Sequence, residues 1–355
     1  MRPFQTELLD LAFKAASTFP SDPHLKNRAR AQEVVVKAFL KLNETERALA
    51  QAQRIDHWRR AACYAEVAHQ LARAGDRSAS ERCLELASHA VSELEKDANG
   101  QSWPQERVTA RIEATRSFLR QAGQVAASQP AASRLAEQVK RLEGVVAGSD
   151  FDQVRGVLET LVDLHAEVGT QGAVRAQVED RVLHSYPRLP LRMRMELWIR
   201  LVDSAITHTD SPRALELVEA AEAAIDAATW LPEDRIPLLA RLAARRNRAG
   251  DAAGARRAAE ALLLAYAAER GRMVDIARAG VLCPLAETFV SLGDRAAAQR
   301  LYERAVVESL ENPNSRPRAD ALVAICCSLA IQAVDPDATL RAKLIAVCDG
   351  LGDPW

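Results

Sequence analysis

Short turns of the Gly-Asp type recur along this chain, and each one separates two stretches with helical periodicity. They stand at Gly75-Asp76, Gly250-Asp251 and Gly293-Asp294, while Thr209-Asp210 and Asp335-Pro336-Asp337 occupy equivalent places. Glycine can take the left-handed conformation that ends a helix, and aspartate accepts hydrogen bonds from the first turn of the next helix. A chain divided in this way is expected to fold as a series of helical hairpins that pack on their neighbours.

The segment from Leu282 to Ser309 shows the hairpin pattern most clearly. Its apolar residues are Leu285, Ala286 and Phe289 before the turn and Ala298, Tyr302 and Ala305 after it. Because residues three or four apart share a helix face, each set forms one apolar stripe. Related sets surround the turns near Asn43, Gly75 and Thr209, and a weaker set surrounds Gly250. In the weaker set Arg246 stands where an aromatic residue is expected.

This order of residues resembles the tetratricopeptide repeat (TPR) family, which has a Leu-small pair, an aromatic residue, a turn, and then small, aromatic and small residues. The resemblance implies an all-α, right-handed α-solenoid of antiparallel helix pairs, and we expect about 16–17 helices along the chain. The turns from Thr209 to Gly250 and from Gly250 to Gly293 are 41 and 43 residues apart, whereas the common TPR period is about 34. A period of about 42 is similar to that of kinesin light chains, and LYERAVVESLENPNSRP resembles a segment of their repeats.

The N-terminal half is less regular, and this irregularity predicts how the chain is divided. Residues 1–121 are expected to form TPR-like pairs, residues 122–172 an irregular helical connection, and residues 173–355 a C-terminal array with a capping helix. The middle segment contains VAASQPAAS and VVAGSDF, where the repeat pattern is weakest. Trp355 is expected to fold back and cover the last helix pair, since the end of a solenoid must be shielded.

Composition narrows the class of protein further. The net charge is −1, with 47 basic and 48 acidic residues, which argues against a dedicated nucleic-acid binder. None of the six cysteines forms a C-x-x-C pair, so free thiols in a reducing compartment are expected. The N-terminal stretch reads as an amphipathic helix rather than a signal peptide, and no apolar run suffices for a membrane span. A cytoplasmic protein is the prediction.

Motifs of catalysis are not found in the sequence. It contains no phosphate-binding loop, no G-x-S-x-G and no H-E-x-x-H, and its seven histidines are scattered. Cys63 with His69 and Cys83 with His89 are six residues apart, which turns their side chains away from each other on a helix. We therefore expect a protein that is not an enzyme and has no metal site and no cofactor.

Two surfaces are predicted to bind a protein partner. In TPR arrays the first helix of each pair lines a groove, which here places Glu66, His69, Arg73, Glu196, Arg200, Asp203, Arg241, Asn247, Arg248 and Glu287 on it. The segment from Arg235 to Arg257 holds seven arginines against one acidic residue. Its remaining candidates are Arg235, Arg245, Arg256 and Arg257. This basic run can recognise an acidic surface or peptide, or it can be a solvated helix face neutralised by a neighbouring helix.

The identity of the partner is left open by the sequence, as is the oligomeric state. The chain is similar to the kinesin-light-chain-like TPR proteins that accompany bacterial tubulins, and that resemblance implies a tubulin-like cytoskeletal filament with an acidic surface. The alternative is a regulator of bacterial signalling that senses a peptide. A third hypothesis, an enzyme on a helical scaffold, requires titratable side chains that converge in one pocket.

Overall fold

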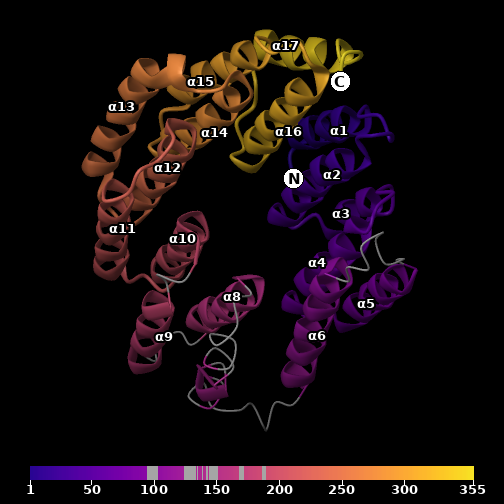
Figure 1. Cartoon of the computed structure of the whole chain (residues 1–355), viewed down its shortest axis with the longest axis vertical. Coiled ribbons are helices and arrows are strands. Elements are labelled where there is room, and N and C mark those ends of the chain that lie inside the picture. Colours follow the sequence, from indigo (N-terminus) through magenta and orange to yellow (C-terminus); the bar gives the residue numbers. More distant parts are fainter. Residues whose placement is uncertain are drawn as a thin grey trace. The chain divides into compact units, whose positions relative to one another are not determined.

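The computed structural model describes residues 1–93, 103–123, 151–167, 172–185 and 189–355, together with 133, 135–137, 139–140 and 143. Within these residues the protein contains sixteen α-helices and one short 3-10 helix, and it has no β-strand (Figure 1). The predicted all-α class and the expected number of helices are therefore confirmed for the described part of the chain.

The helices belong to two compact units, which are described separately. Unit 1 contains residues 1–128, 274–283 and 299–355, and unit 2 contains residues 129–273 and 284–298. Wholly in unit 1 are α1 (Pro3–Ser17), α2 (Leu25–Lys41), α3 (Thr45–Ala52), α4 (Arg59–Arg73), α5 (Arg77–Ser92), α6 (Trp103–Gly123), α16 (Ser315–Ile331) and α17 (Ala338–Asp349). Wholly in unit 2 are α8 (Phe151–Glu167), α9 (Gly172–Ser185), α10 (Leu191–Thr207), α11 (Ser211–Asp226), α12 (Pro232–Arg248), α13 (Ala252–Glu269) and the 3-10 helix η2 (Arg270–Arg272). Both units contain residues of α14 (Asp275–Ser291) and α15 (Arg295–Ser309).

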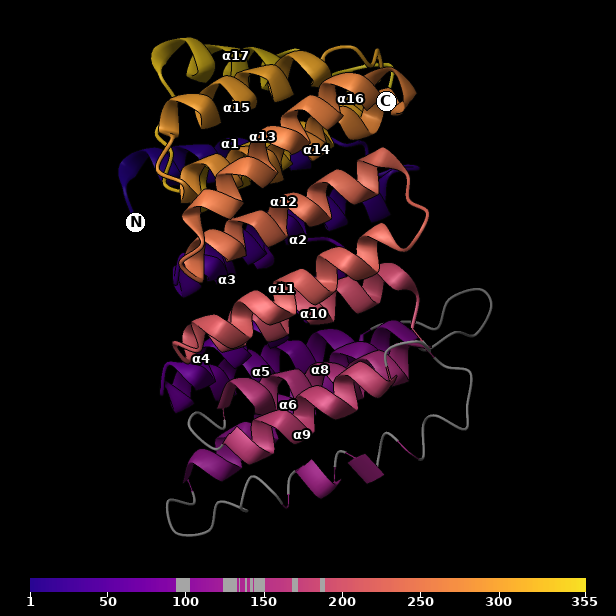
Figure 2. The same ribbon diagram turned by 90° about the vertical axis from the view of Figure 1, so that its left-hand side faces the viewer.

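The predicted turns form as the sequence indicated. Gly75, Gly250 and Gly293 have φ angles of 86°, 103° and 78°, in the left-handed region that glycine enters without steric cost. After each glycine an aspartate carboxylate accepts a backbone N–H in the first turn of the next helix, as Asp251 does from Gly254 at 2.8 Å. Adjacent helices in unit 2, from α10 to α13, consequently pack side by side (Figure 2).

The repeat residues form the core that the pattern predicted. Leu285, Ala286, Phe289, Ala298 and Tyr302 are all at most 3% exposed. Most residues of the sets around Gly75 and Thr209 are also buried, with Trp198 among them, whereas Leu71 is half-buried. The buried residues of successive pairs join, and most of those from Leu135 to Ala249 form one continuous apolar core, as expected for stacked tandem repeats.

The two ends of the chain lie together within unit 1. Helix α1 packs extensively on α16 (Figure 1), and the ring of Trp355 lies 5.5 Å from that of Phe19. The backbone N–H of Ser315 donates to the carbonyl of Pro354 at 2.8 Å. The tail thus folds back onto the start of α16, and its terminal tryptophan contacts the N-terminal segment.

The predicted division of the chain can be compared with the structure only in part. The expected irregular connection, residues 122–172, includes helix α8, and most of its remainder lies outside the described residues. The three-part division therefore stays a prediction. In the part of the chain that the structure describes, no helix combines the length and the apolar character needed to cross a membrane.

Candidate functional site

First helices of neighbouring pairs in unit 2 are joined by arginine–carboxylate pairs. Arg241 of α12 donates from both terminal nitrogens to Glu196 of α10, at 2.8 and 3.1 Å. Arg200 of α10 donates to Asp163 of α8 at 2.6 Å. Arginine suits this role because its planar guanidinium matches two carboxylate oxygens. The predicted groove residues of this unit are therefore brought onto one face, the first-helix face, defined by these residues of α8, α10 and α12.

Asp203 of α10 accepts hydrogen bonds from two arginines of α12. Arg245 donates to one oxygen at 2.6 Å and Arg248 to the other at 2.9 Å. Burial lowers the pKa of Arg245; Asp203 acts against this, and the charges of Arg241 and Arg248 lower the pKa further. In this part of the first-helix face two arginines therefore share the carboxylate of Asp203, while Arg241 beside them pairs with Glu196.

The α12–α14 side of the first-helix face carries fewer charges. Asn247 donates to the carbonyl of Ser291 at 2.5 Å, which ties the end of α12 to α14. Burial lowers the pKa of Arg241, but the hydrogen bond and charge of Glu196 outweigh it, and the charge of Glu287 contributes to the net upward shift. Asn247 and Glu287 thus lie where they support the arginines rather than form a separate site.

The predicted groove residues of unit 1 also contact the next first helix. Glu66 of α4 accepts a hydrogen bond from Arg111 of α6 at 2.6 Å. The ring of His69 lies 3.3 Å from the hydroxyl of Thr115, measured from Nδ1, and burial followed by the charges of Arg111 and Arg73 lowers its pKa to about 4. His69 is consequently a neutral packing residue at ordinary pH, and Arg73 lies exposed beside it.

The basic run between Arg235 and Arg257 does not gather on one surface. Arg235 pairs with Asp226 at 2.7 Å, and Arg246 donates to Glu222 and to Asp251. Arg256 approaches Asp294 at 3.8 Å, and Arg257 is exposed on α13. Arg246 replaces the aromatic residue of the repeat pattern because acidic partners on α11 and in the turn surround its guanidinium. Only Arg241, Arg245 and Arg248 lie on the first-helix face.

A buried polar cluster, here called the polar junction, connects α8, α9, α10 and α11. His165 is 0% exposed; its Nδ1 lies 2.7 Å from Ser204 Oγ and its Nε2 2.9 Å from Glu179 Oε1. Arg213 donates to the other oxygen of Glu179 at 2.9 Å. Burial raises the pKa of Glu179, but the hydrogen bond from His165 and the charge of Arg213 outweigh it, so the pKa lies below its ordinary value.

The polar junction was missed by the sequence reading, which treated its histidine as one of seven scattered residues. His165 stands 14 residues from Glu179 and 39 from Ser204 along the chain, and His165 and Glu179 lie on α8 and α9, where the repeat pattern is weak. The one sequence signal for such a cluster is a polar residue at a helix position that the repeat pattern assigns to an apolar residue. Ser204, His165 and Glu179 form a chain of hydrogen bonds in which both Ser204 and His165 are buried.

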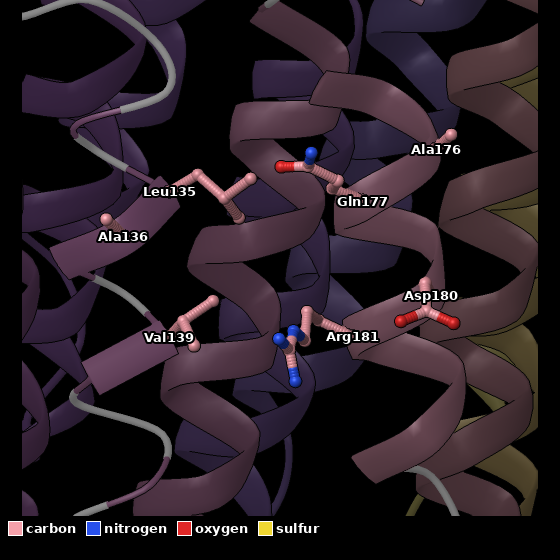
Figure 3. Close-up of a pocket in the computed structure, with 7 residues that line it drawn as sticks. All are labelled: Leu135, Ala136, Val139, Ala176, Gln177, Asp180 and Arg181. Carbon is pink, nitrogen blue, oxygen red and sulfur yellow. The ribbon is translucent and has the colours of Figure 1, made fainter. Parts of the chain in front are cut away.

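One open pocket of about 590 Å³ lies between α9 and the described residues just before α8. Its lining residues are Leu135, Ala136, Val139, Ala176, Gln177, Asp180 and Arg181. In Figure 3, Leu135 and Val139 extend toward Gln177 and Arg181. The lining brings one acid and one base together without a histidine, cysteine or serine. Among the described residues, no group of three or more His, Cys, Asp or Glu side chains is placed to hold a metal ion.

Comparisons with known proteins give little guidance. No family model and no curated protein matches the sequence. Among the solved structures that match is a circular tandem repeat protein described as having a novel repeat topology and enhanced subunit contact surfaces. It is 15% identical, the match covers 98% of this chain and 94% of that chain, and the TM-score is 0.31. Backbones that superpose this poorly give no basis for transferring an activity or a partner.

Proposed function

We propose that this protein is a non-enzymatic helical-repeat scaffold that binds acidic side chains of a protein partner on its first-helix face. The observation that carries the proposal is the sharing of one carboxylate, Asp203, by two guanidiniums, those of Arg245 and Arg248. Arg241 lies beside them and contributes a third positive charge to the surroundings of Arg245.

An incoming carboxylate gains from this arrangement for two reasons. Arg248 is 49% exposed, so a partner can reach it without displacing a core residue. Its guanidinium is already held by Asp203, so little side-chain freedom is lost on binding. A further negative charge relieves the repulsion among neighbouring arginines, and it forms charge-assisted hydrogen bonds that are stronger than neutral ones.

The chemistry of the face selects an acidic protein surface rather than a small molecule. Helical-repeat arrays present extended surfaces to protein partners, and complementary charge accelerates and orients their encounter. The specific partner that we propose is a tubulin-like cytoskeletal filament, which the lengthened repeats and an acidic filament surface favour. The peptide-sensing alternative predicts instead that a short acidic peptide binds the same arginines.

Co-sedimentation with tubulin-like filaments tests the proposal. The Arg248→Glu variant is expected to bind at least tenfold more weakly, because it replaces an attraction with a repulsion, and binding by the native chain should weaken with salt. Arg256→Glu is the matched control, since Arg256 is similarly exposed at 45% but lies on α13. Equal losses in both variants would refute the assigned face. Binding of an acidic peptide without filament binding would favour the peptide sensor.

A further inference from the structure

Helix α1 has its main partner at the opposite end of the chain. It packs more extensively on α16 than on α2, its neighbour in sequence, and α16 in turn packs more extensively on α1 than on α17. Helix α2 also packs on α16, where Arg30 lies 3.6 Å from Asp320. In a repeat array the two helices of a pair pack on each other, and both pack on the first helix of the next pair. Here α16 and α1 pack on each other in this way, and both pack on α2. Helix α1 therefore occupies the place of a second helix for α16.

The contact is formed by an apolar stripe on each helix. On α1 the stripe consists of residues spaced three and four apart, which are at most 3% exposed: Leu8, Leu9, Ala12, Phe13 and Ala16. On α16 the buried apolar residues include Ile325, Leu329 and Ala330, none more than 1% exposed. Side chains of this size contribute most of the free energy of helix packing. Without α1, a continuous apolar face of α16 would be open to water.

Polar contacts set the register of α1 on this face. The side-chain amide of Gln5 donates to the carbonyl of Ala330 at 2.7 Å in a buried hydrogen bond. Glu7 pairs with Arg341 and Lys14 pairs with Asp349. Because these two residues of α1 are seven apart, they lie on one exposed face, and that face is aligned with α17. A buried amide bonded to a carbonyl fixes one register, because any slip leaves both groups without a partner.

We propose that α1 is a strap that closes the terminal junction, defined here as the packing of α1 on α16 and α17. The strap can dock only on a face that α16 presents, because α16 is its most extensive partner. It also opens as a unit, since undocking one terminal helix exposes less apolar surface than unfolding unit 1. The open state presents the apolar face of α16 that α1 covers in the closed state.

Buried thiols report on the state of the strap. All six cysteines are free and buried. Cys326 and Cys327 lie on α16 and Cys348 on α17, where the charge of Lys14 acts on Cys348. Cys63 and Cys83 lie on α4 and α5, helices away from the terminal junction. Cys283 lies on α14, where its charge acts on Cys326, and it is not used as a reporter. Opening of the strap is therefore expected to expose Cys326, Cys327 and Cys348 and to leave Cys63 and Cys83 protected.

The first experiment undocks the strap in the full-length chain. Phe13→Asp places a charge in the α1 stripe, and alkylation of Cys326, Cys327 and Cys348 is expected to become at least tenfold faster, while Cys63 and Cys83 stay protected. A synthetic peptide of residues 1–19 added in trans should restore protection. Labelling at the native rate would overturn the proposal. So would equal labelling of all cysteines that the peptide does not reverse, because unit 1 would then unfold as a whole.

The second experiment avoids any change to the core. Lys14→Glu is expected to accelerate alkylation of Cys326 about threefold, in keeping with the modest strength of exposed ion pairs, and Lys14→Glu with Asp349→Lys should return it to the native rate. The matched control is Arg77→Glu, which breaks the Arg77–Glu81 pair of α5. That pair has the same 2.8 Å separation as the Lys14–Asp349 pair and similar exposure. Equal labelling in Lys14→Glu and Arg77→Glu would overturn the proposal.

Discussion

The terminal junction of unit 1 and the polar junction of unit 2 solve the same problem with different chemistry. Both hold together helices whose contacting residues are distant in the sequence. The terminal junction does so with the apolar stripe of α1 and one buried hydrogen bond, from Gln5 to Ala330. The polar junction uses His165, Glu179 and Ser204, which exchange hydrogen bonds in the core.

The difference teaches what each kind of contact contributes. Apolar packing supplies free energy in proportion to the area buried, and it tolerates substitutions that keep volume and shape. A buried polar cluster contributes less net free energy, because its groups are desolvated, but it loses much when one member is removed. We therefore expect the free energy of unfolding to fall most when side-chain volume is removed from the terminal junction. In the polar junction it should fall most when a hydrogen-bond partner is removed.

Removal of the Phe13 ring is expected to have the largest effect. Phe13 is 1% exposed, and Phe13→Ala should lower the free energy of unfolding by about 4 kcal/mol through lost burial and a cavity. Urea denaturation followed by circular dichroism measures this change. Phe13→Leu, which keeps most of the volume, should cost only about 1 kcal/mol. Equal costs for the two variants would contradict an apolar terminal junction.

Removal of the Glu179 charge tests the polar junction. Glu179→Gln keeps the shape but removes the buried carboxylate that His165 and Arg213 share. A loss of about 1.5 kcal/mol is expected, because Arg213 is 37% exposed and keeps its pair with Glu216. Glu216→Gln is the matched control, because Glu216 also pairs with Arg213 at 2.6 Å but is 63% exposed. The control should lose about 0.5 kcal/mol or less. Similar losses in the two variants, measured by urea denaturation, would show that burial of the pair is unimportant.

Acid is expected to lower the stability of the two units over different pH ranges. In unit 1 the folded pKa of His69 is about 4, below its ordinary value of 6.5, so the unfolded chain binds the proton first and stability falls as the pH drops from 6.5 to 4. In unit 2 the pKa of Glu179 lies below 4.5, so the stability from its ionised form is present above 4.5 and is lost at lower pH. His69→Gln should remove on the order of 1 kcal/mol of the loss above pH 4.5. Thermal unfolding from pH 7 to pH 3 measures both slopes, and an unchanged slope in His69→Gln would contradict this assignment.

The sequence could predict those parts of the molecule that depend on near neighbours. The turn at Gly293 and the burial of Phe289 and Tyr302 follow from residues within one helix pair, because periodicity and capping act over a few positions. The pairing of α1 with α16 could not be predicted in this way. Amphipathic stripes do not specify their partners, and nothing in the stripe of α1 distinguishes α16 from α2.

The repeat pattern predicts which helices carry the candidate residues, but it does not predict how their charges pair. Arg241, Arg248 and Asp203 were correctly placed on first helices by the repeat pattern, and the structure brings them onto one face. Their mutual pairing depends on side chains from helices about 42–45 residues apart, which no local pattern encodes. The basic run is therefore continuous in sequence, but its arginines pair with carboxylates on different elements of the structure.

Two turns without glycine allow the smallest test, one beside each junction. Thr209 precedes α11 of the polar junction and Ala333 precedes α17 of the terminal junction, with φ angles of 57° and 51°. A side chain in the left-handed region costs roughly 1–2 kcal/mol, part of which glycine loses again through the greater freedom of the unfolded chain. Thr209→Gly and Ala333→Gly should each raise the free energy of unfolding by about 0.5 kcal/mol. Gly250→Ala, at a φ of 103°, is the reverse control and should lower it by about 1 kcal/mol or more.

If Ala333→Gly stabilises the protein and also slows alkylation of Cys348, a relaxed turn favours the closed strap. Faster alkylation would show that the turn strain holds α17 against α1.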